Sequence, residues 1–233
     1  MWSEPLAVVT GTSSGIGRAV ASHLLAAGWR VHGLDLAPST LSGDRFEPHT
    51  LDLTDRAPLD AWLARPATPL PQAVVHAAGV LRSAALGALA PADTDLMWRL
   101  HVDAAQRLAN VLLPRMAEAG AGRFVLVGSR VWEGIAGRSA YAATKAALHS
   151  LGRSWAAEVA DRGVTVNVVS PAATRTGMLT DPQRGPAASR LPPTGRLIEP
   201  EEVAQLVAYL LSPEAAAITG QDIAICGGSS VRS

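Results

Sequence analysis

The sequence contains almost no cysteine, since Cys226 is the only thiol among its 233 residues. A single cysteine excludes a disulfide within the chain, which fits a reducing compartment. Cys226 also has no further ligands at the spacing that metal sites require, so we expect no bound metal.

The chain also lacks an excess of either charge. It has 20 Lys and Arg against 20 Asp and Glu, and its basic residues form no run. A nucleic-acid binder needs a concentrated basic surface. We therefore expect no nucleic-acid partner and a small neutral or mildly polar substrate.

Long apolar runs are absent as well, because none reaches the roughly 18–20 residues that would cross a bilayer. The first residues contain no basic segment followed by an apolar stretch and a small-residue cleavage site. These absences predict a cytoplasmic protein without a membrane partner or an export signal.

Short β-rich runs alternate with helical patterns along the chain. Helices are predicted over Ala92–Met116, where leucine and alanine recur every fourth residue, over Ser139–Ala160, and from Pro200 onward. Strands separated by helices form a parallel sheet with helices on both faces. We predict one doubly wound α/β domain over residues 1–233, with about seven strands: Leu6–Thr10, Arg30–Leu34, Thr50–Leu53, Ala73–His76, Phe124–Val127, Val164–Val169 and Asp222–Ile225.

Residues 177–196 are rich in proline, glycine and serine and carry no periodic pattern. Segments of this length within a compact domain often serve as active-site lids. We expect this segment to be a substrate lid.

A glycine-rich turn follows the first predicted strand and opens a helix. Such a turn lets backbone N–H groups approach a pyrophosphate at the positive end of a helix. The residues expected to hold the cofactor here are Gly11, Ser13, Ser14, Gly15, Ile16 and Gly17.

Asp35 ends the second predicted strand, where a carboxylate can accept hydrogen bonds from both adenosine ribose hydroxyls. A carboxylate would repel a 2′-phosphate at this position, and the glycine turn contains no Arg or Lys to neutralise that phosphate. This pattern predicts NAD(H) in preference to NADP(H).

Tyr141 and Lys145 are one helical turn apart in Tyr141-Ala142-Ala143-Thr144-Lys145, on the same helix face. A tyrosine has a pKa of about 10, and a neighbouring ammonium can lower it. Tyr141 could then exchange a proton with an alcohol or ketone while a hydride moves to or from nicotinamide. Lys145 could also hold the nicotinamide ribose, and Ser129 could bind the substrate oxygen.

These motifs together resemble the classical short-chain dehydrogenase/reductase family over nearly the whole chain. The resemblance implies a Rossmann fold, a dimer or tetramer, a secondary alcohol or ketone substrate, and a catalytic group of Ser129, Tyr141 and Lys145. It also implies cofactor contacts from Tyr141 and Lys145 and from Asp52, Leu53, Ala77, Ala78, Gly79, Pro171, Ala172, Thr174 and Thr176.

Two histidines depart from the family pattern. His101 stands where the family usually has a helix asparagine whose backbone holds a relay water, and His76 replaces another usual asparagine. Imidazole titrates near neutral pH, so His101 is a candidate for the proton relay, with packing as the alternative.

Two other functions are compatible with these residues. The first is a catalytically impaired protein that binds NAD(H) and reports its redox state to a partner. The second is a reductase of 3-oxoacyl thioesters, an enzyme class that generally needs NADPH and a basic surface for an acidic carrier, whereas Asp35 and the zero net charge argue against both.

Substrate specificity is expected from the residues after Ser129 and from the predicted lid. Trp132 offers an apolar or stacking wall. Arg130, Arg184 and Arg190 are candidates to bind a carboxylate or sugar hydroxyls, with solvent exposure as the alternative.

Overall fold

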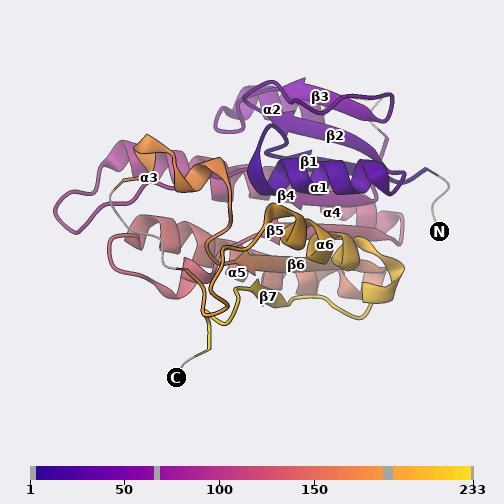
Figure 1. Ribbon diagram of the computed structural model, residues 1–233. Helices are drawn as coiled ribbons and strands as arrows, with labels where there is room; N and C mark the ends of the chain where they lie inside the picture. Colours follow the sequence, from indigo (N-terminus) through magenta and orange to yellow (C-terminus); the bar gives the residue numbers. More distant parts are fainter. Residues whose placement is uncertain (1–3, 66–68, 186–190, 232–233) are drawn as a thin grey trace.

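The computed structural model describes residues 4–65, 69–185 and 191–231. Within these ranges seven strands form one parallel sheet in the order β3-β2-β1-β4-β5-β6-β7. Figure 1 shows the sheet with helices on both sides. The predicted doubly wound α/β fold is therefore confirmed.

Most predicted elements lie where the sequence places them. The strands are β1 Leu6–Thr10, β2 Arg30–Asp35, β3 Phe46–Thr50, β4 Ala73–His76, β5 Gly122–Val127, β6 Val164–Pro171 and β7 Asp222–Ile225. The helices are α1 Gly15–Ala26, α2 Arg56–Leu63, α3 Pro91–Trp98, α4 Ala104–Glu118, α5 Ser139–Val159 and α6 Pro200–Leu211. None of the helices among the described residues is long and apolar enough to span a membrane.

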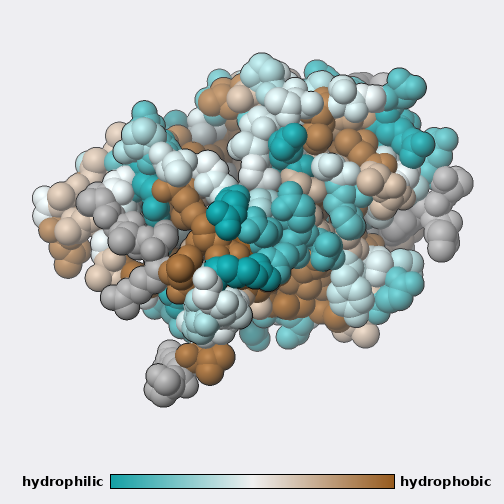
Figure 2. Space-filling view, in the orientation of Figure 1, coloured by the Kyte–Doolittle hydropathy of each residue, from teal (hydrophilic) through white to brown (hydrophobic). Residues whose placement is uncertain are grey.

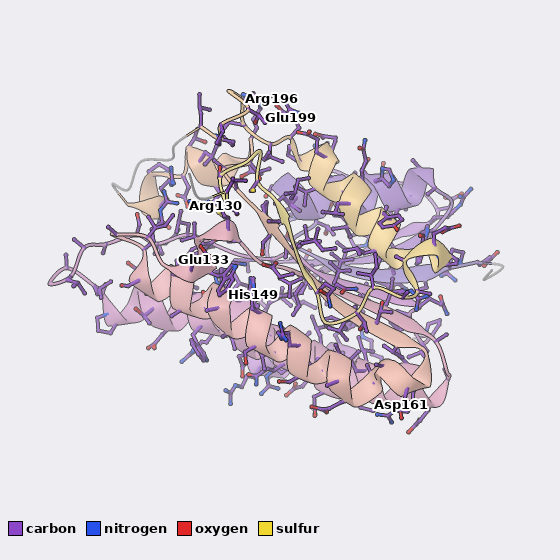
Figure 3. The ribbon with its side chains drawn as sticks, turned by 90° about the horizontal axis from the view of Figure 1, so that it is seen from below. Arg130, Glu133, His149, Asp161, Arg196 and Glu199 are labelled. Carbon is purple, nitrogen blue, oxygen red and sulfur yellow. The ribbon has the colours of Figure 1, made fainter. Side chains whose placement is uncertain are left out.

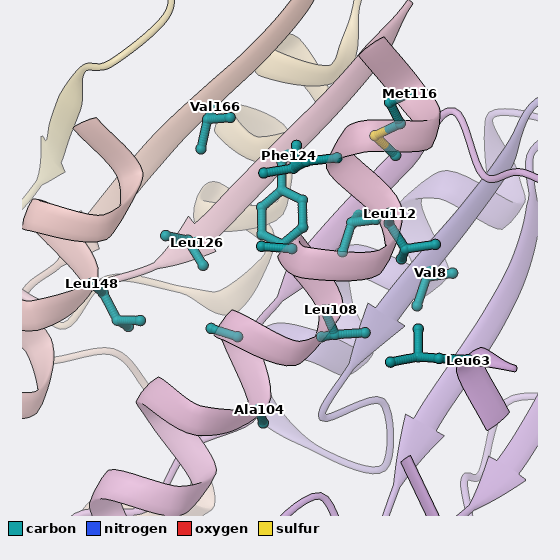
Figure 4. Packing of buried hydrophobic residues seen from close by; sticks show 14 of the residues in the cluster. Val8, Leu63, Ala104, Leu108, Leu112, Met116, Phe124, Leu126, Leu148 and Val166 are labelled. Carbon is teal, nitrogen blue, oxygen red and sulfur yellow. The ribbon is translucent and has the colours of Figure 1, made fainter. Parts of the chain in front are cut away.

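Each face of the sheet packs a separate apolar layer. On one face, α4 presents Leu108, Leu112 and Met116 to Phe124 and Leu126 of β5, all of them buried (Figure 4). On the opposite face, α1 and α6 cover the other side of the same strands. Strands buried on both faces explain the nearly continuous apolar runs in the sequence.

The third strand was predicted wrongly at Thr50–Leu53, since β3 occupies Phe46–Thr50. β3 is the edge strand of the sheet, and apart from Phe46 its residues are exposed or partly exposed. Pro48 lies in this strand, a residue that sheets tolerate at an edge. The apolar residues that suggested a strand, Leu51 and Leu53, instead follow β3 and pack against the core.

The long helix predicted over Ala92–Met116 is interrupted by a π-helical segment at Arg99–Asp103, between α3 and α4. π-Helical turns within helices often occur at functional sites. This segment passes directly behind the cleft described below, and it contains His101.

The strand order reverses between β1 and β4, because β1 pairs with β2 on one side and with β4 on the other. In open α/β sheets, ligands bind beyond the carboxyl ends of the strands at such a point. The described part of the predicted lid, with short helical turns at Gly177–Leu179 and Pro182–Arg184, follows β6 at this same end. Arg190, a predicted substrate contact, lies outside the described residues.

Candidate active site

The glycine turn between β1 and α1 brings bare backbone to the cleft. Gly11 and Gly15 have φ of +78° and +53°, values that side-chain-bearing residues rarely adopt. A Cβ on Gly17 would lie 2.3 Å from the Gly11 carbonyl oxygen, so no side chain fits there. α1 begins at Gly15, and its free N–H groups and dipole favour an anion at this turn. The residues present therefore fit a dinucleotide pyrophosphate.

A single cleft of about 1260 Å³ runs across the carboxyl end of the sheet. It joins the glycine turn, the end of β2, the β4 loop, the end of β5, the start of α5 and the segment after β6. The predicted site residues that line it are Gly11, Ser13, Ser14, Gly15, Ile16, Gly17, Asp35, Asp52, Leu53, Ala77, Ala78, Gly79, Ser129, Tyr141, Lys145, Pro171, Ala172, Thr174 and Thr176. The structure thus brings together every predicted catalytic and cofactor-binding residue except His101. Trp132, predicted as a wall of the substrate site, lies outside the cleft lining, with its ring centre 4.4 Å from that of His149.

Ser129, Tyr141 and Lys145 meet at the inner end of the cleft, and all three are buried. The Tyr141 hydroxyl forms a hydrogen bond with the Ser129 side chain. Lys145 Nζ donates to the Val127 carbonyl oxygen at 2.9 Å and lies 5.8 Å from the centre of the Tyr141 ring. Strand β5 and helix α5 therefore hold a phenol, a hydroxyl and an amine around one point.

The expected lowering of the Tyr141 pKa by Lys145 is not what the structure shows. Burial raises the pKa of Tyr141 above 10.0, and the groups that oppose this rise are Ser129, Arg138 and Arg184. Burial also lowers the pKa of Lys145 to about 7. The spacing of Tyr141 and Lys145 can be read from the sequence, but their burial cannot. Burial disfavours both the phenolate and the ammonium.

His101 lies behind the cleft, fully buried in the π-helical segment. Its Nε2 accepts a hydrogen bond from the Val80 backbone N–H at 3.0 Å. Its Nδ1 lies 2.9 Å from Thr144 Oγ1, a hydroxyl that itself donates to the Tyr141 carbonyl oxygen at 2.8 Å. Both ring nitrogens are therefore engaged, and burial holds the pKa of His101 well below 6.5.

His76 ties the end of β4 to the same π-helical segment. Its Nδ1 accepts from Thr10 Oγ1 at 3.0 Å, because that hydroxyl oxygen already accepts the Ala77 and Ala78 N–H groups. Its Nε2 donates to the Leu100 carbonyl oxygen at 3.1 Å. Burial, followed by the charge of Lys145, lowers the pKa of His76 to about 4.

This low pKa predicts a loss of stability in acid. An unfolded chain takes up a proton on histidine near pH 6.5, whereas folded His76 does so only near pH 4. Between these values the unfolded state binds more protons, so the free energy of unfolding decreases as the pH decreases. Between pH 7 and pH 4, the melting temperature of His76→Asn should therefore fall less than that of the wild type. His23→Asn, at an exposed position of α1, controls for the substitution, and an unchanged slope in His76→Asn would contradict the prediction.

Sequence reasoning missed Arg138 and Arg82, which line the cleft beside Tyr141 together with the predicted Arg130 and Arg184. Arg138 is the residue before α5 and stands three positions before Tyr141. Its φ of −135° and ψ of 26° are not helical, so the spacing of residues within a helix does not predict where its side chain lies.

The absence of a metal remains a prediction. Among the described residues, His32, Glu47 and His49 form one group that could hold a metal ion, on β2 and β3 and outside the cleft lining. His32 Nδ1 and His49 Nε2 lie 3.0 Å apart, a hydrogen-bond distance.

Comparison with known proteins places this geometry among reductases. Residues 11–230 match the family model described as enoyl-(acyl carrier protein) reductase. The 3-oxoacyl-[acyl-carrier-protein] reductase FabG of Vibrio harveyi is 36% identical over 235 residues, covering 96% of each chain. FabG of Escherichia coli K12 is 35% identical with the same coverage. A solved short chain dehydrogenase/reductase family protein superposes with a TM-score of 0.87 and 31% identity over 100% of both chains.

These relatives contradict the predicted preference for NAD(H). Enzymes of the 3-oxoacyl-[acyl-carrier-protein] reductase class use NADPH, which points to NADP(H) for this chain. The prediction considered only the Asp35 carboxylate and the absence of Arg and Lys from the glycine turn. In the structure the Asp35 carboxylate accepts the Ser13 and Ala37 N–H groups at 2.8 and 2.9 Å, which offsets part of its charge. Arg18, just after the turn, reaches Thr40 Oγ1 at 3.0 Å in the loop that follows Asp35.

Replacing Asp35 with serine should raise kcat/KM for NADPH. A carboxylate near the 2′-phosphate costs about 1–2 kcal/mol at a partly exposed site, equivalent to about 5- to 30-fold. Steady-state kinetics with varied NADPH test this, with exposed Asp44→Ser as the control in the same loop region. A kcat/KM for NADPH that stays equal or decreases in Asp35→Ser would show that this carboxylate does not oppose the phosphate.

Proposed function

The chain belongs to the short-chain dehydrogenase/reductase family and is an oxidoreductase acting on a carbonyl or CH–OH group; from this we propose that it reduces a ketone to a secondary alcohol, with Tyr141 as the proton donor. When bound, a reduced nicotinamide dinucleotide supplies the hydride. The observation that carries the proposal is the buried hydrogen bond between Tyr141 and Ser129 in the cleft.

The direction of the Tyr141 pKa favours reduction. Because burial raises this pKa, the phenol is protonated at neutral pH and can donate to an oxygen that gains negative charge. Ser129 and Tyr141 together can hold that oxygen, since their hydroxyl groups already meet. A dehydrogenase that works mainly in the direction of alcohol oxidation would be favoured by the opposite shift, toward a phenolate.

Lys145 and His101 have different roles in this proposal. Lys145 lines the cleft and can donate to a ribose hydroxyl of the cofactor, with the Val127 carbonyl as its present acceptor. His101 is a positioning residue. Through Val80 N–H and Thr144 Oγ1 it links the β4 loop to the helix turn that carries Tyr141.

A second candidate is reduction of a 3-oxoacyl thioester, the activity named for the FabG relatives. Because the relatives point to NADP(H), the NADPH requirement of this enzyme class no longer argues against this candidate. The other objection stands, because the formal net charge is zero and an acidic carrier favours a basic surface. A homo-oligomeric state and a cytoplasmic location remain predictions.

Steady-state oxidation of NADPH with a panel of ketones tests the proposal and ranks the two candidates. The panel should contain 3-oxo acids, their methyl esters, cyclic ketones and a 3-oxoacyl thioester. Turnover of at least one ketone supports the proposal, and a preference for the thioester supports the second candidate. Tight binding of NADPH without turnover of any member would contradict both and favour the sensor alternative.

A further inference from the structure

Two histidines and a glutamate meet on strands β2 and β3, at the edge of the sheet and outside the cleft lining. His32 of β2 pairs with Glu47 of β3, and His49 stands two residues after Glu47. Side chains at these positions point to the same face of a sheet. On that face Trp62 of α2 packs edge-on against both histidine rings. Imidazole and carboxylate groups are typical zinc ligands, so this group is a candidate metal site.

The donor atoms are as far apart as the ligands of one metal ion. His49 Nε2 lies 3.0 Å from His32 Nδ1 and 3.4 Å from Glu47 Oε1, and Glu47 Oε2 lies 3.6 Å from His32 Nε2. Zinc binds imidazole nitrogen and carboxylate oxygen at about 2.0–2.2 Å, and tetrahedral geometry then puts two ligands about 3.3–3.6 Å apart. The three side chains therefore match a shared ion to within a few tenths of an ångström.

His32 has a ring nitrogen without a hydrogen-bond partner among the described residues. Its side chain is 8% exposed, and the unpaired atom is Nε2. The hydrogen bond between His32 Nδ1 and His49 Nε2 uses one proton, so His32 Nε2 is left as an unpaired donor or an unpaired acceptor. A buried polar atom in this state destabilises the fold. A metal ion bound at Nε2 would give this atom a partner.

The group is open to solvent at the edge of the sheet. The Glu47 side chain is 55% exposed, and His49 is partly exposed. Figure 2 shows hydrophilic residues among hydrophobic ones at the top of the view, where β3 lies. A metal ion can therefore reach the three ligands from solution, which a binding site requires.

The charges around the group permit a cation. Burial lowers the pKa of both histidines, Glu47 opposes this decrease, and Arg65 adds to it. Neutral imidazole is the form that binds a metal. Arg30 also lowers the pKa of His32, and both arginines oppose a bound cation. Both are exposed, however, so solvent and salt screen their charge, whereas the Glu47 carboxylate lies within 3.6 Å of both imidazoles.

Another pair of histidine and carboxylate lacks these properties. His149 Nδ1 on α5 lies 3.4 Å from Asp222 Oδ2 on β7, and Figure 3 shows His149 on that helix. Ser170 Oγ donates to Asp222 at 2.6 Å and lies 3.2 Å from His149 Nε2, so both side chains already have a protein partner. Among the described residues, no third histidine, cysteine or carboxylate joins this pair.

We propose that His32, Glu47 and His49 bind one zinc ion, with water as the fourth ligand, and that this ion fastens the edge strand β3 to β2. Nitrogen and carboxylate ligands in a group of three favour zinc over Mg²⁺ and Ca²⁺, which take six or more oxygen ligands. The expectation of no bound metal considered only Cys226, and this proposal runs against it. The site is separate from the cleft and does not depend on the proposed reduction.

The first test is isothermal titration of ZnCl₂ into the untagged full chain after removal of bound metal with a chelator. The wild type should bind one zinc ion per chain with a Kd below about 10 µM. His49→Gln and Glu47→Gln should each weaken this binding at least about 10-fold, because each removes a ligand. These two positions are more exposed than His32 or less central to the core, so the variants should fold. His23→Gln, at an exposed position of α1, should bind zinc as the wild type does.

A stability measurement shows whether the ion joins the strands of the folded protein. The unfolded chain does not hold the three ligands together, so zinc should stabilise the native state. At a zinc concentration 100 times the Kd, the melting temperature of the wild type and of His23→Gln should rise by about 5–10 °C. The same zinc concentration should leave the melting temperature of His49→Gln unchanged, and MgCl₂ should shift none of the three proteins.

The visible absorption of bound Co²⁺ reports the coordination number, because four-coordinate Co²⁺ absorbs far more strongly than six-coordinate Co²⁺. The wild type should give the four-coordinate spectrum and His49→Gln should not. A wild-type Kd for zinc above about 10 µM would overturn the proposal. An unchanged Kd in His49→Gln would also overturn it, because the ion would then bind elsewhere on the chain.

Discussion

Tyr141→Phe should lower kcat for ketone reduction by about 10²–10⁴-fold, the usual contribution of a positioned proton donor. Phenylalanine keeps the ring that packs edge-on against His101, with ring centres 5.6 Å apart, and removes only the hydroxyl that meets Ser129. The dissociation constant for NADPH should therefore stay nearly unchanged. Rapid-quench kinetics and a fluorescence titration with NADPH measure the two quantities separately.

The second tyrosine of the chain provides a matched control. Tyr209 lies on α6, is 48% exposed and is outside the cleft lining. Tyr209→Phe should keep wild-type kcat. If Tyr141→Phe retained wild-type kcat, the proton would have to come from another donor, and the role given to Tyr141 would be wrong.

Gly17→Ala should abolish tight NADPH binding and destabilise the fold. The added Cβ would lie 2.3 Å from the Gly11 carbonyl oxygen and 2.7 Å from the Thr10 carbonyl oxygen. Both are backbone atoms, so α1 or the turn must move. We expect a loss of about 3 kcal/mol in the free energy of unfolding, the upper part of the usual range for overpacking. This corresponds to a decrease in melting temperature of about 6–12 °C.

Gly177→Ala is the control for this substitution. Gly177 also lines the cleft, but a Cβ there would meet no heavy atom within 4 Å, and its φ lies outside the left-handed region. Differential scanning calorimetry with and without NADPH should show a wild-type melting temperature and a wild-type NADPH shift for Gly177→Ala. A Gly17→Ala protein that keeps both values would show that close backbone approach in the turn is not required.

The sequence was sufficient to predict the parts of the site that depend on chain order and spacing. The glycine turn follows a strand and opens a helix, and Tyr141 and Lys145 are one turn apart, so local geometry alone places them. Parallel strands then bring their carboxyl ends to one edge of the sheet. This topology explains why residues from Gly11 to Thr176 line one cleft.

The features that were missed depend on surroundings that spacing does not reveal. Desolvation decides the Tyr141 pKa, and it acts against the effect expected from Lys145. Edge position decides where β3 lies, because an edge strand needs no apolar run. His101 was considered as a relay because of its position, but its hydrogen-bond partners, Val80 and Thr144, come from two other segments. Cofactor preference likewise depends on groups beyond the turn itself.

The central claim is that a hydride passes between nicotinamide and a carbonyl carbon in this cleft. The most direct measurement uses NADPH deuterated at the transferable position of its ring, with the ketone panel as acceptors and mass spectrometry of the products. The account predicts deuterium on the carbinol carbon of at least one product alcohol, with little product from Tyr141→Phe. Bound NADPH with no deuterium in any product would contradict it and would indicate a protein that binds the cofactor without catalysing the reaction.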